Sequence, residues 1–195
     1  MILPIVAYGA QVLKKKAKEV DLKDLTLPTF IKNLWETMYA ASGVGLAAPQ
    51  VGVSLRIFVI DASPFSEDDE LSSEEQKVLA DFKKVFINPT ILSETGDSWP
   101  FNEGCLSIPN IREDVMRPDQ LQIYYLDADF KERKETYSGL AARVIQHEYD
   151  HIEGVLFTDK LSALKKRLLK GKLSQIAKGN VDVDYVMRFP NDLKL

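Results

Sequence analysis

This chain of 195 residues has one cysteine, two histidines and no long apolar stretch. A single cysteine cannot form a disulfide within the chain, which excludes a disulfide-stabilised secreted scaffold. No segment approaches the roughly 20 apolar residues of a membrane helix. The start of the chain also lacks the basic stretch and apolar core of a secretory signal. We therefore expect a cytoplasmic protein that does not enter a membrane.

Hydrophobic residues make up 45% of the sequence, enough for one sizeable core, and we expect residues 1–195 to form a single domain. The net charge of −4 is unevenly spread, because residues 64–77 carry −5 and leave +1 for the rest. We expect 64–77 to be an acidic surface insertion between two strands, either a solvated loop or a short exposed helix.

The few histidines are concentrated in one motif, the run Q-H-E-Y-D-H at 146–151. Residues four apart lie above one another on a helix, so His147 and His151 can reach one ion while Glu148 projects beside it. This arrangement supplies two metal ligands and a general base for hydrolysis. The five-residue pattern also occurs by chance on exposed, charged helices.

A third metal ligand has to come from elsewhere in the chain. The longer zinc-protease pattern needs a third histidine where this chain has Phe157, and no glutamate follows Glu153. Cys105, in the run F-N-E-G-C-L-S, is the remaining candidate, because a metal makes its thiolate available near neutral pH. Taken alone, a lone cysteine is more typical of a small buried hydrophobe.

The run G-V-G-L-A-A-P-Q at 43–50 has little side-chain bulk. Such a segment suits a loop whose backbone passes close to a ligand, although it is also typical of a plain connection between a helix and a strand. Its last residue, Gln50, carries an amide that can donate a hydrogen bond to an oxyanion without carrying charge.

The three runs G-V-G-L-A-A-P-Q, E-G-C-L-S and H-E-Y-D-H, in this order, resemble the three motifs of the peptide deformylase family. The resemblance covers nearly the whole chain. It implies that Cys105, His147 and His151 bind one divalent metal ion. In the family this ion is ferrous iron (Fe2+) in the cell, and Ni2+, Co2+ or Zn2+ can occupy the same site.

The resemblance also implies catalytic roles. Glu148 would be the acid and base, while Gln50 and the backbone N–H of Leu106 would stabilise the oxyanion. The reaction would remove the formyl group from the initiator methionine of new polypeptides and release formate. Two alternatives are a metallopeptidase with the same H-E-x-x-H chemistry, and a non-catalytic relative kept for ribosome binding.

Substrate contacts follow from the resemblance and from helical spacing. Leu140 and Val144 lie seven and three residues before His147, so they share its helix face and could line a slot for the methionine side chain, although ordinary core packing explains them equally well. Arg143 stands where many relatives have an apolar residue, and the role of Arg117 is left open. The expected substrate-binding residues are Gly45, Val44, Glu103, Leu140, Val144 and Arg112.

The periodicity of the chain predicts an α+β fold, with antiparallel or mixed sheets around a central metal-binding helix and a further helix near the C-terminus. We expect helices at 10–18, 28–41 and from about 138 to 154. Strands are expected at 55–60, 84–92 and 121–127.

From Lys160 to Lys172, lysines and an arginine alternate with leucines, which predicts a basic amphipathic helix. One interpretation is docking onto ribosomal RNA. The other is an ordinary surface helix whose leucines pack on the body. The expected partners are formyl-methionyl nascent peptides and, through this helix, the ribosome. We expect no DNA binding and a monomer.

Overall fold

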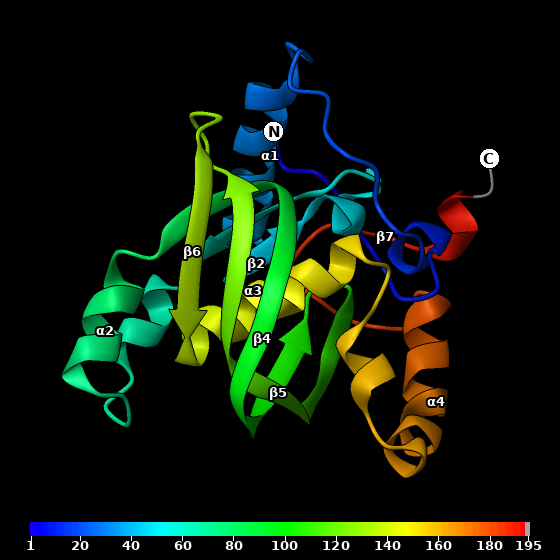
Figure 1. Cartoon of the computed structure of the whole chain (residues 1–195). Helices are drawn as coiled ribbons and strands as arrows, with labels where there is room; N and C mark the ends of the chain where they lie inside the picture. Colours follow the sequence, from blue (N-terminus) through cyan, green and yellow to red (C-terminus); the bar gives the residue numbers. More distant parts are fainter. Residues whose placement is uncertain (194–195) are drawn as a thin grey trace.

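The computed structural model describes residues 1–193 and has an antiparallel sheet with the strand order β2-β3-β4-β5-β6 (Figure 1). Its strands are β2 Gly45–Ala47, β3 Ile57–Asp61, β4 Lys83–Cys105, β5 Ile108–Leu126 and β6 Glu132–Ser138. The helices are α1 Leu27–Ala40, α2 Ser73–Ala80, α3 Gly139–Ile152 and α4 Ala163–Ala177. The predicted α+β class is therefore confirmed.

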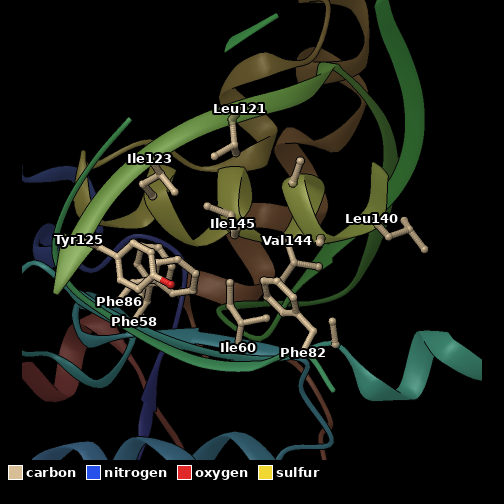
Figure 2. Close-up of a cluster of buried hydrophobic side chains, with 14 of the residues drawn as sticks. Phe58, Ile60, Phe82, Phe86, Leu121, Ile123, Tyr125, Leu140, Val144 and Ile145 are labelled. Carbon is tan, nitrogen blue, oxygen red and sulfur yellow. The ribbon is translucent and has the colours of Figure 1, made fainter. Parts of the chain in front are cut away.

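The longest strands, β4 and β5, form one hairpin whose connecting turn contains only two residues, Leu106 and Ser107. The pairing shifts register at four points along the hairpin. Such irregularities bend the strand and increase its twist. Figures 1 and 2 show the hairpin curving around α3, so the end of β4 is brought to the helix that carries the histidines.

The main core lies between α3 and the concave side of this sheet. Ala141, Val144 and Ile145 of α3 pack with aromatic and branched side chains of the strands, among them Phe58 and Phe86 (Figure 2). The rings of Phe58 and Phe86 stack with centroids 4.8 Å apart. Burying each such side chain stabilises the fold by about 1.5–3 kcal/mol. The predicted central packing of the ligand helix against the strands is confirmed.

Helix prediction succeeded where the apolar spacing was regular. The helix expected at 28–41 is α1, with Pro28 in its first turn and Leu34 and Met38 buried on one face. The helix expected at 138–154 is α3, and the basic helix is α4, which begins three residues later than expected and runs further.

Four predicted segments differ from the structure. The helix expected at 10–18 is wrong, because only Gln11–Lys14 turns, as a 3-10 helix, and Lys18 then bridges to Leu55 as extended chain. The strands expected at 84–92 and 121–127 are parts of the much longer β4 and β5. The second half of β4 is mostly exposed, whereas the first half of β5 buries Ile111 and Val115, which the sequence analysis did not assign to a strand. The glycine-rich segment 43–50 is partly regular, since Gly45–Ala47 is a strand and Ala48–Val51 a 3-10 helix.

The acidic segment between β3 and β4 folds into a 3-10 helix, Ser63–Glu67, and α2. Ser72 caps α2 by accepting a hydrogen bond from the Glu75 N–H at 3.2 Å. The Glu75 side chain in turn accepts from the Leu140 N–H at 3.0 Å, at the first turn of α3. A carboxylate there complements the positive end of the helix dipole. This part of the segment therefore supports the ligand helix.

The two ends of the described chain meet in a second, parallel sheet. β1 Ile5–Val6 pairs with β7 Met187–Arg188. α4 lies near this sheet and buries Leu169 and Leu173, while Leu164 and Leu168 are 67% and 72% exposed. Among residues 1–193, no helix is long and apolar enough to cross a membrane.

Candidate metal centre

Helix α3 places His147 and His151 one turn apart, with ring centroids 5.1 Å from each other. Cys105, the last residue of β4, completes a cluster in which one ligand atom from each residue lies within 4.8 Å of the others. The Cys105 Sγ is 3.4 Å from the His151 Nε2. The structure thus brings together the three residues that the sequence predicted as ligands.

The donor set suits a divalent transition metal. One thiolate and two imidazoles match the borderline-soft ligands of zinc, iron, cobalt and nickel sites. Burial lowers the pKa of His151 well below its usual range, which favours the neutral ring that a metal needs. Burial also lowers the pKa of His147, but hydrogen bonds with Cys105 and Glu103 outweigh it and raise that pKa to about 10. A bound cation would take the place of this proton.

Glu148 lies beside the cluster and is only 4% exposed. Burial raises the pKa of Glu148 to about 7. Within residues 1–193 its Oε2 has no hydrogen-bond partner. The carboxylate packs directly against Gly45, where a methyl group would overlap it. Gly45 is therefore required by the Glu148 side chain as well as by any ligand that approaches the backbone.

Gln50 and Leu106 lie on the other side of the cluster. The Gln50 Oε1 accepts a hydrogen bond from the Ala47 N–H at 2.8 Å, which turns its Nε2 toward the Cys105 Sγ, 3.5 Å away. The amide can therefore only present a donor to this region. In the part of the chain that the structure describes, no backbone group accepts from the Leu106 N–H.

Glu103 was expected at the substrate pocket, and its carboxylate is bound by side chains of the protein itself. One oxygen, Oε2, lies 2.9 Å from the His147 Nδ1. Arg117 donates to both oxygens, at 2.7 and 2.9 Å, and Arg143 donates to Oε1 at 3.1 Å. Burial raises the pKa of Glu103, but hydrogen bonds from Arg117 and His147 outweigh this effect and hold the pKa below its usual range. Glu103 is therefore an anion. A carboxylate in this position orients a metal-ligating imidazole.

The three arginines of the sequence analysis have different surroundings. Arg117 is buried and extends the network by donating to the Asp150 Oδ2 at 2.6 Å. Arg143 is 1% exposed and stacks over the Trp99 ring, 4.4 Å from its centroid, while donating to the Trp99 carbonyl at 2.7 Å. Arg112 is exposed and binds Asn102. Thus Arg117 and Arg143 are both paired with anions inside the protein, although the Arg143 Nε has no hydrogen-bond partner among the described residues.

A cavity of about 770 Å³ opens beside the cluster. Val44, Gly45, Glu103, Arg112 and Val144, five of the six residues expected to bind substrate, line it. Leu140 is not among the lining residues of the described chain and lies in the core (Figure 2).

Sequence reasoning missed two parts of the cavity wall. One is the aromatic pair Phe65 and Phe101, whose rings meet edge to face at 6.3 Å. The second is residues 182–185, far along the chain, where the alternation of apolar and acidic residues in V-D-V-D-Y was an unused signal of extended structure. The run W-P-F at 99–101 was the only available signal for the aromatic part.

Comparison with known proteins gives consistent results. Residues 2–167 match the family described as Polypeptide deformylase. The chain is 62% identical over 194 residues to the peptide deformylase of Christiangramia forsetii, covering 100% of this chain and 99% of the relative.

Solved structures agree as well. A peptide deformylase from Legionella pneumophila is similar with a TM-score of 0.76 and 38% identity, over 92% of this chain and 98% of that one. The peptide deformylase from Thermotoga maritima has a TM-score of 0.72 and 37% identity, over 83% of this chain and 99% of that one.

Proposed function

Because this chain belongs to the polypeptide deformylase family, it is a metallohydrolase that removes the N-terminal formyl group of nascent peptides, and we propose that the Cys105, His147 and His151 cluster is its metal site. The observation that carries this proposal is the convergence of three ligand atoms within 4.8 Å, next to a buried, unpartnered carboxylate. Membership of the family sets aside the metallopeptidase and the non-catalytic alternatives.

The metal is proposed to be Fe2+ in the cell, with Ni2+, Co2+ or Zn2+ able to replace it. An ion held by Cys105, His147 and His151 would supply Lewis-acid chemistry, which activates water as a nucleophile and polarises a carbonyl oxygen. Thiolate ligation by Cys105 favours such metals over magnesium or calcium, and it also makes the site sensitive to oxidation.

Glu148 is the proton carrier in this proposal. Its carboxylate is buried beside the ligands, and its pKa of about 7 lies close to physiological pH. A general base is most effective when its pKa is near the working pH, since it then both accepts and returns a proton. Glu148 would take a proton from the attacking water and deliver it to the departing amine nitrogen.

Gln50 and the backbone N–H of Leu106 are the proposed oxyanion donors. The Ala47 N–H fixes the Gln50 amide at 2.8 Å, so no reorientation is needed when charge develops on the formyl oxygen. Preorganised donors of this kind contribute more in a site shielded from water. Gly45 would offer its backbone to the substrate, which can approach closely because Gly45 has no side chain.

The methionine side chain would occupy the cavity beside Val44 and Val144, where Phe65 and Phe101 complete an apolar wall. Arg112, at the exposed rim, would contact the peptide beyond the methionine. Glu103 lines the cavity, but its contacts assign it to the support of His147. Leu140 would act from the core by packing behind Val144.

The remaining proposals concern the binding partner, the oligomeric state and the cellular location of the protein. α4 presents Leu164 and Leu168 to solvent among lysines, which suits docking onto ribosomal RNA. A monomer in the cytoplasm would fit this role. Co-sedimentation with ribosomes at increasing salt tests it, with a Lys166→Glu and Lys170→Glu double variant as the comparison. Binding that is independent of both salt and charge reversal would refute the docking.

The decisive experiment measures formate release from a formyl-methionyl peptide by protein purified without oxygen, with metal content determined on the same sample. We expect release that follows the metal content and no cleavage of the unformylated peptide. Glu148→Ala should lower turnover by roughly 10²–10⁴-fold while the metal stays bound. Near-wild-type turnover in that variant would refute the role of Glu148. Unchanged metal affinity in Cys105→Ser would refute the ligand set.

A further inference from the structure

The Leu106–Ser107 turn is held from outside the hairpin by two hydrogen bonds. The Tyr185 hydroxyl donates to the Leu106 carbonyl at 2.8 Å. The Tyr8 backbone N–H donates to the Ser107 carbonyl at 2.8 Å. Both carbonyls of the turn are therefore bound by segments that are far from it in sequence.

The two donors belong to one structural unit. Tyr8 follows β1 and Tyr185 precedes β7, and these strands pair with each other. Additional backbone bonds join the strands at Ile5, whose N–H donates to the Val186 carbonyl, and at Ala7, whose N–H donates to the Arg188 carbonyl. The two-stranded sheet thus presents both donors from a fixed frame.

Tyr185 is also part of the cavity wall. It lines the cavity together with Asp182 and Asp184, and its half-buried ring packs with Leu106 in the same apolar cluster. The carbonyl that the Tyr185 hydroxyl binds belongs to Leu106, the same residue whose N–H is the proposed donor. A tyrosine that only anchored a chain end would not need this hydrogen bond.

We propose that Tyr185 is a positioning residue, which fixes the Leu106–Ser107 turn so that the Leu106 N–H faces the cavity. The proposal rests on the proposed function in one respect, the use of that N–H as an oxyanion donor. A donor contributes to the rate only if it is already in place when charge develops, since small displacements weaken it strongly. The hydroxyl of Tyr185 supplies this restraint from the protein side.

The test compares Tyr185→Phe with Tyr125→Phe. Both changes remove one hydroxyl that is hydrogen-bonded, but the Tyr125 hydroxyl binds Glu135 at 2.6 Å and Tyr125 does not line the cavity. For Tyr185→Phe we expect kcat to fall about fivefold, the effect of one neutral hydrogen bond, with KM within about twofold. Metal content should be unchanged. For Tyr125→Phe we expect a lower Tm and unchanged kcat.

A second measurement is independent of turnover. In the zinc-loaded protein, 15N relaxation should show lower order at the Leu106 and Ser107 amides in Tyr185→Phe and unchanged order there in Tyr125→Phe. Unchanged order, or a kcat within twofold of wild type, would overturn the proposal. A loss of bound zinc in Tyr185→Phe would also overturn it, because Tyr185 would then act through Cys105. Failure of the proposed function would appear instead as wild-type protein that releases no formate.

Discussion

The two sides of the metal centre are built from different kinds of group. Behind His147 lies a charged side, which we define as Glu103, Arg117, Arg143 and Asp150 and which is largely buried. Toward the cavity lies a neutral side, defined as residues 43–50 with the Leu106–Ser107 turn, where backbone groups and one amide are presented. In the function proposed above, the charged side fixes the positions of the metal ligands and the neutral side meets the substrate. Substitutions on the charged side should therefore lower stability and metal affinity. Substitutions on the neutral side should lower the reaction rate.

The largest effect should follow from Glu103→Ala, because it leaves Arg117 and Arg143 buried without their shared anion. Breaking such a buried pair costs about 3–5 kcal/mol of unfolding free energy. The loss of the carboxylate behind His147 should also weaken metal binding by roughly 10–100-fold. Chemical denaturation and metal titration test both effects.

Glu113→Ala is the matched control, because Glu113 pairs with Glu103 in the β4–β5 register but bonds only Lys165 near the surface. It should change stability by less than about 1 kcal/mol. If the two variants were equally stable, the charged side would have no special part in holding the centre.

The next largest effect should come from Gln50→Ala on the neutral side. Removing one oxyanion donor lowers kcat by roughly 10²–10³-fold. Metal content should stay at the wild-type level, in contrast to Glu103→Ala. Steady-state formate release with metal analysis is the measurement, and Gln122→Ala, on the sheet away from the cavity, serves as control. If Gln50→Ala and Glu103→Ala lost equal amounts of metal, the distinction between the neutral and the charged side would be wrong.

Gly45→Ala should displace the Glu148 carboxylate, which its methyl group would overlap. A misplacement of about 1 Å can lower the rate by roughly 10²-fold. Gly171→Ala is the control, because nothing lies near a methyl group at that helical position. That change should leave the rate unaltered and raise Tm slightly. Wild-type kcat in Gly45→Ala would mean that Glu148 tolerates being moved.

The smallest effect should come from Glu75→Ala, at the start of α3 and outside both sides. Loss of a helix-capping acceptor costs about 1 kcal/mol. Thermal unfolding should show a lower Tm, with kcat per bound metal unchanged. Glu74→Ala, its exposed neighbour on α2, should have no such effect. A loss of turnover in Glu75→Ala would show that the acidic segment acts on the chemistry directly.

The metal ligands, Glu148 and the neutral side could be predicted from the sequence much better than the charged side. Gln50, Cys105, His147 and Glu148 stand in short runs whose spacing itself indicates metal-assisted hydrolysis. Glu103 also stands in such a run, but its contacts could not be predicted from it, because its partners Arg117 and His147 lie 14 and 44 residues away. Only the curvature of the hairpin brings these residues together.

The fold shows the same contrast between local and distant causes. α1 and α3 were predictable because their buried faces repeat at helical spacing. The full length of β4 was not, because its second half is mostly exposed and its polar residues are held by pairing with β5. The segment 181–186 alternates apolar and acidic residues at strand spacing, but this pattern does not indicate its partner, and only the pairing of β7 with β1 places it in the cavity wall.

The pairing of β1 with β7 can form only after both strands have been synthesised, and they lie near opposite ends of the described chain. Ile5 and Val6 leave the ribosome early, but their partners Met187 and Arg188 are among the last described residues to be made. Until then β1 has an unpaired edge and the Leu106–Ser107 turn lacks both of its outside donors. An enzyme that processes chains still being translated thus completes this part of its own cavity wall only after residues 185–188 have been made.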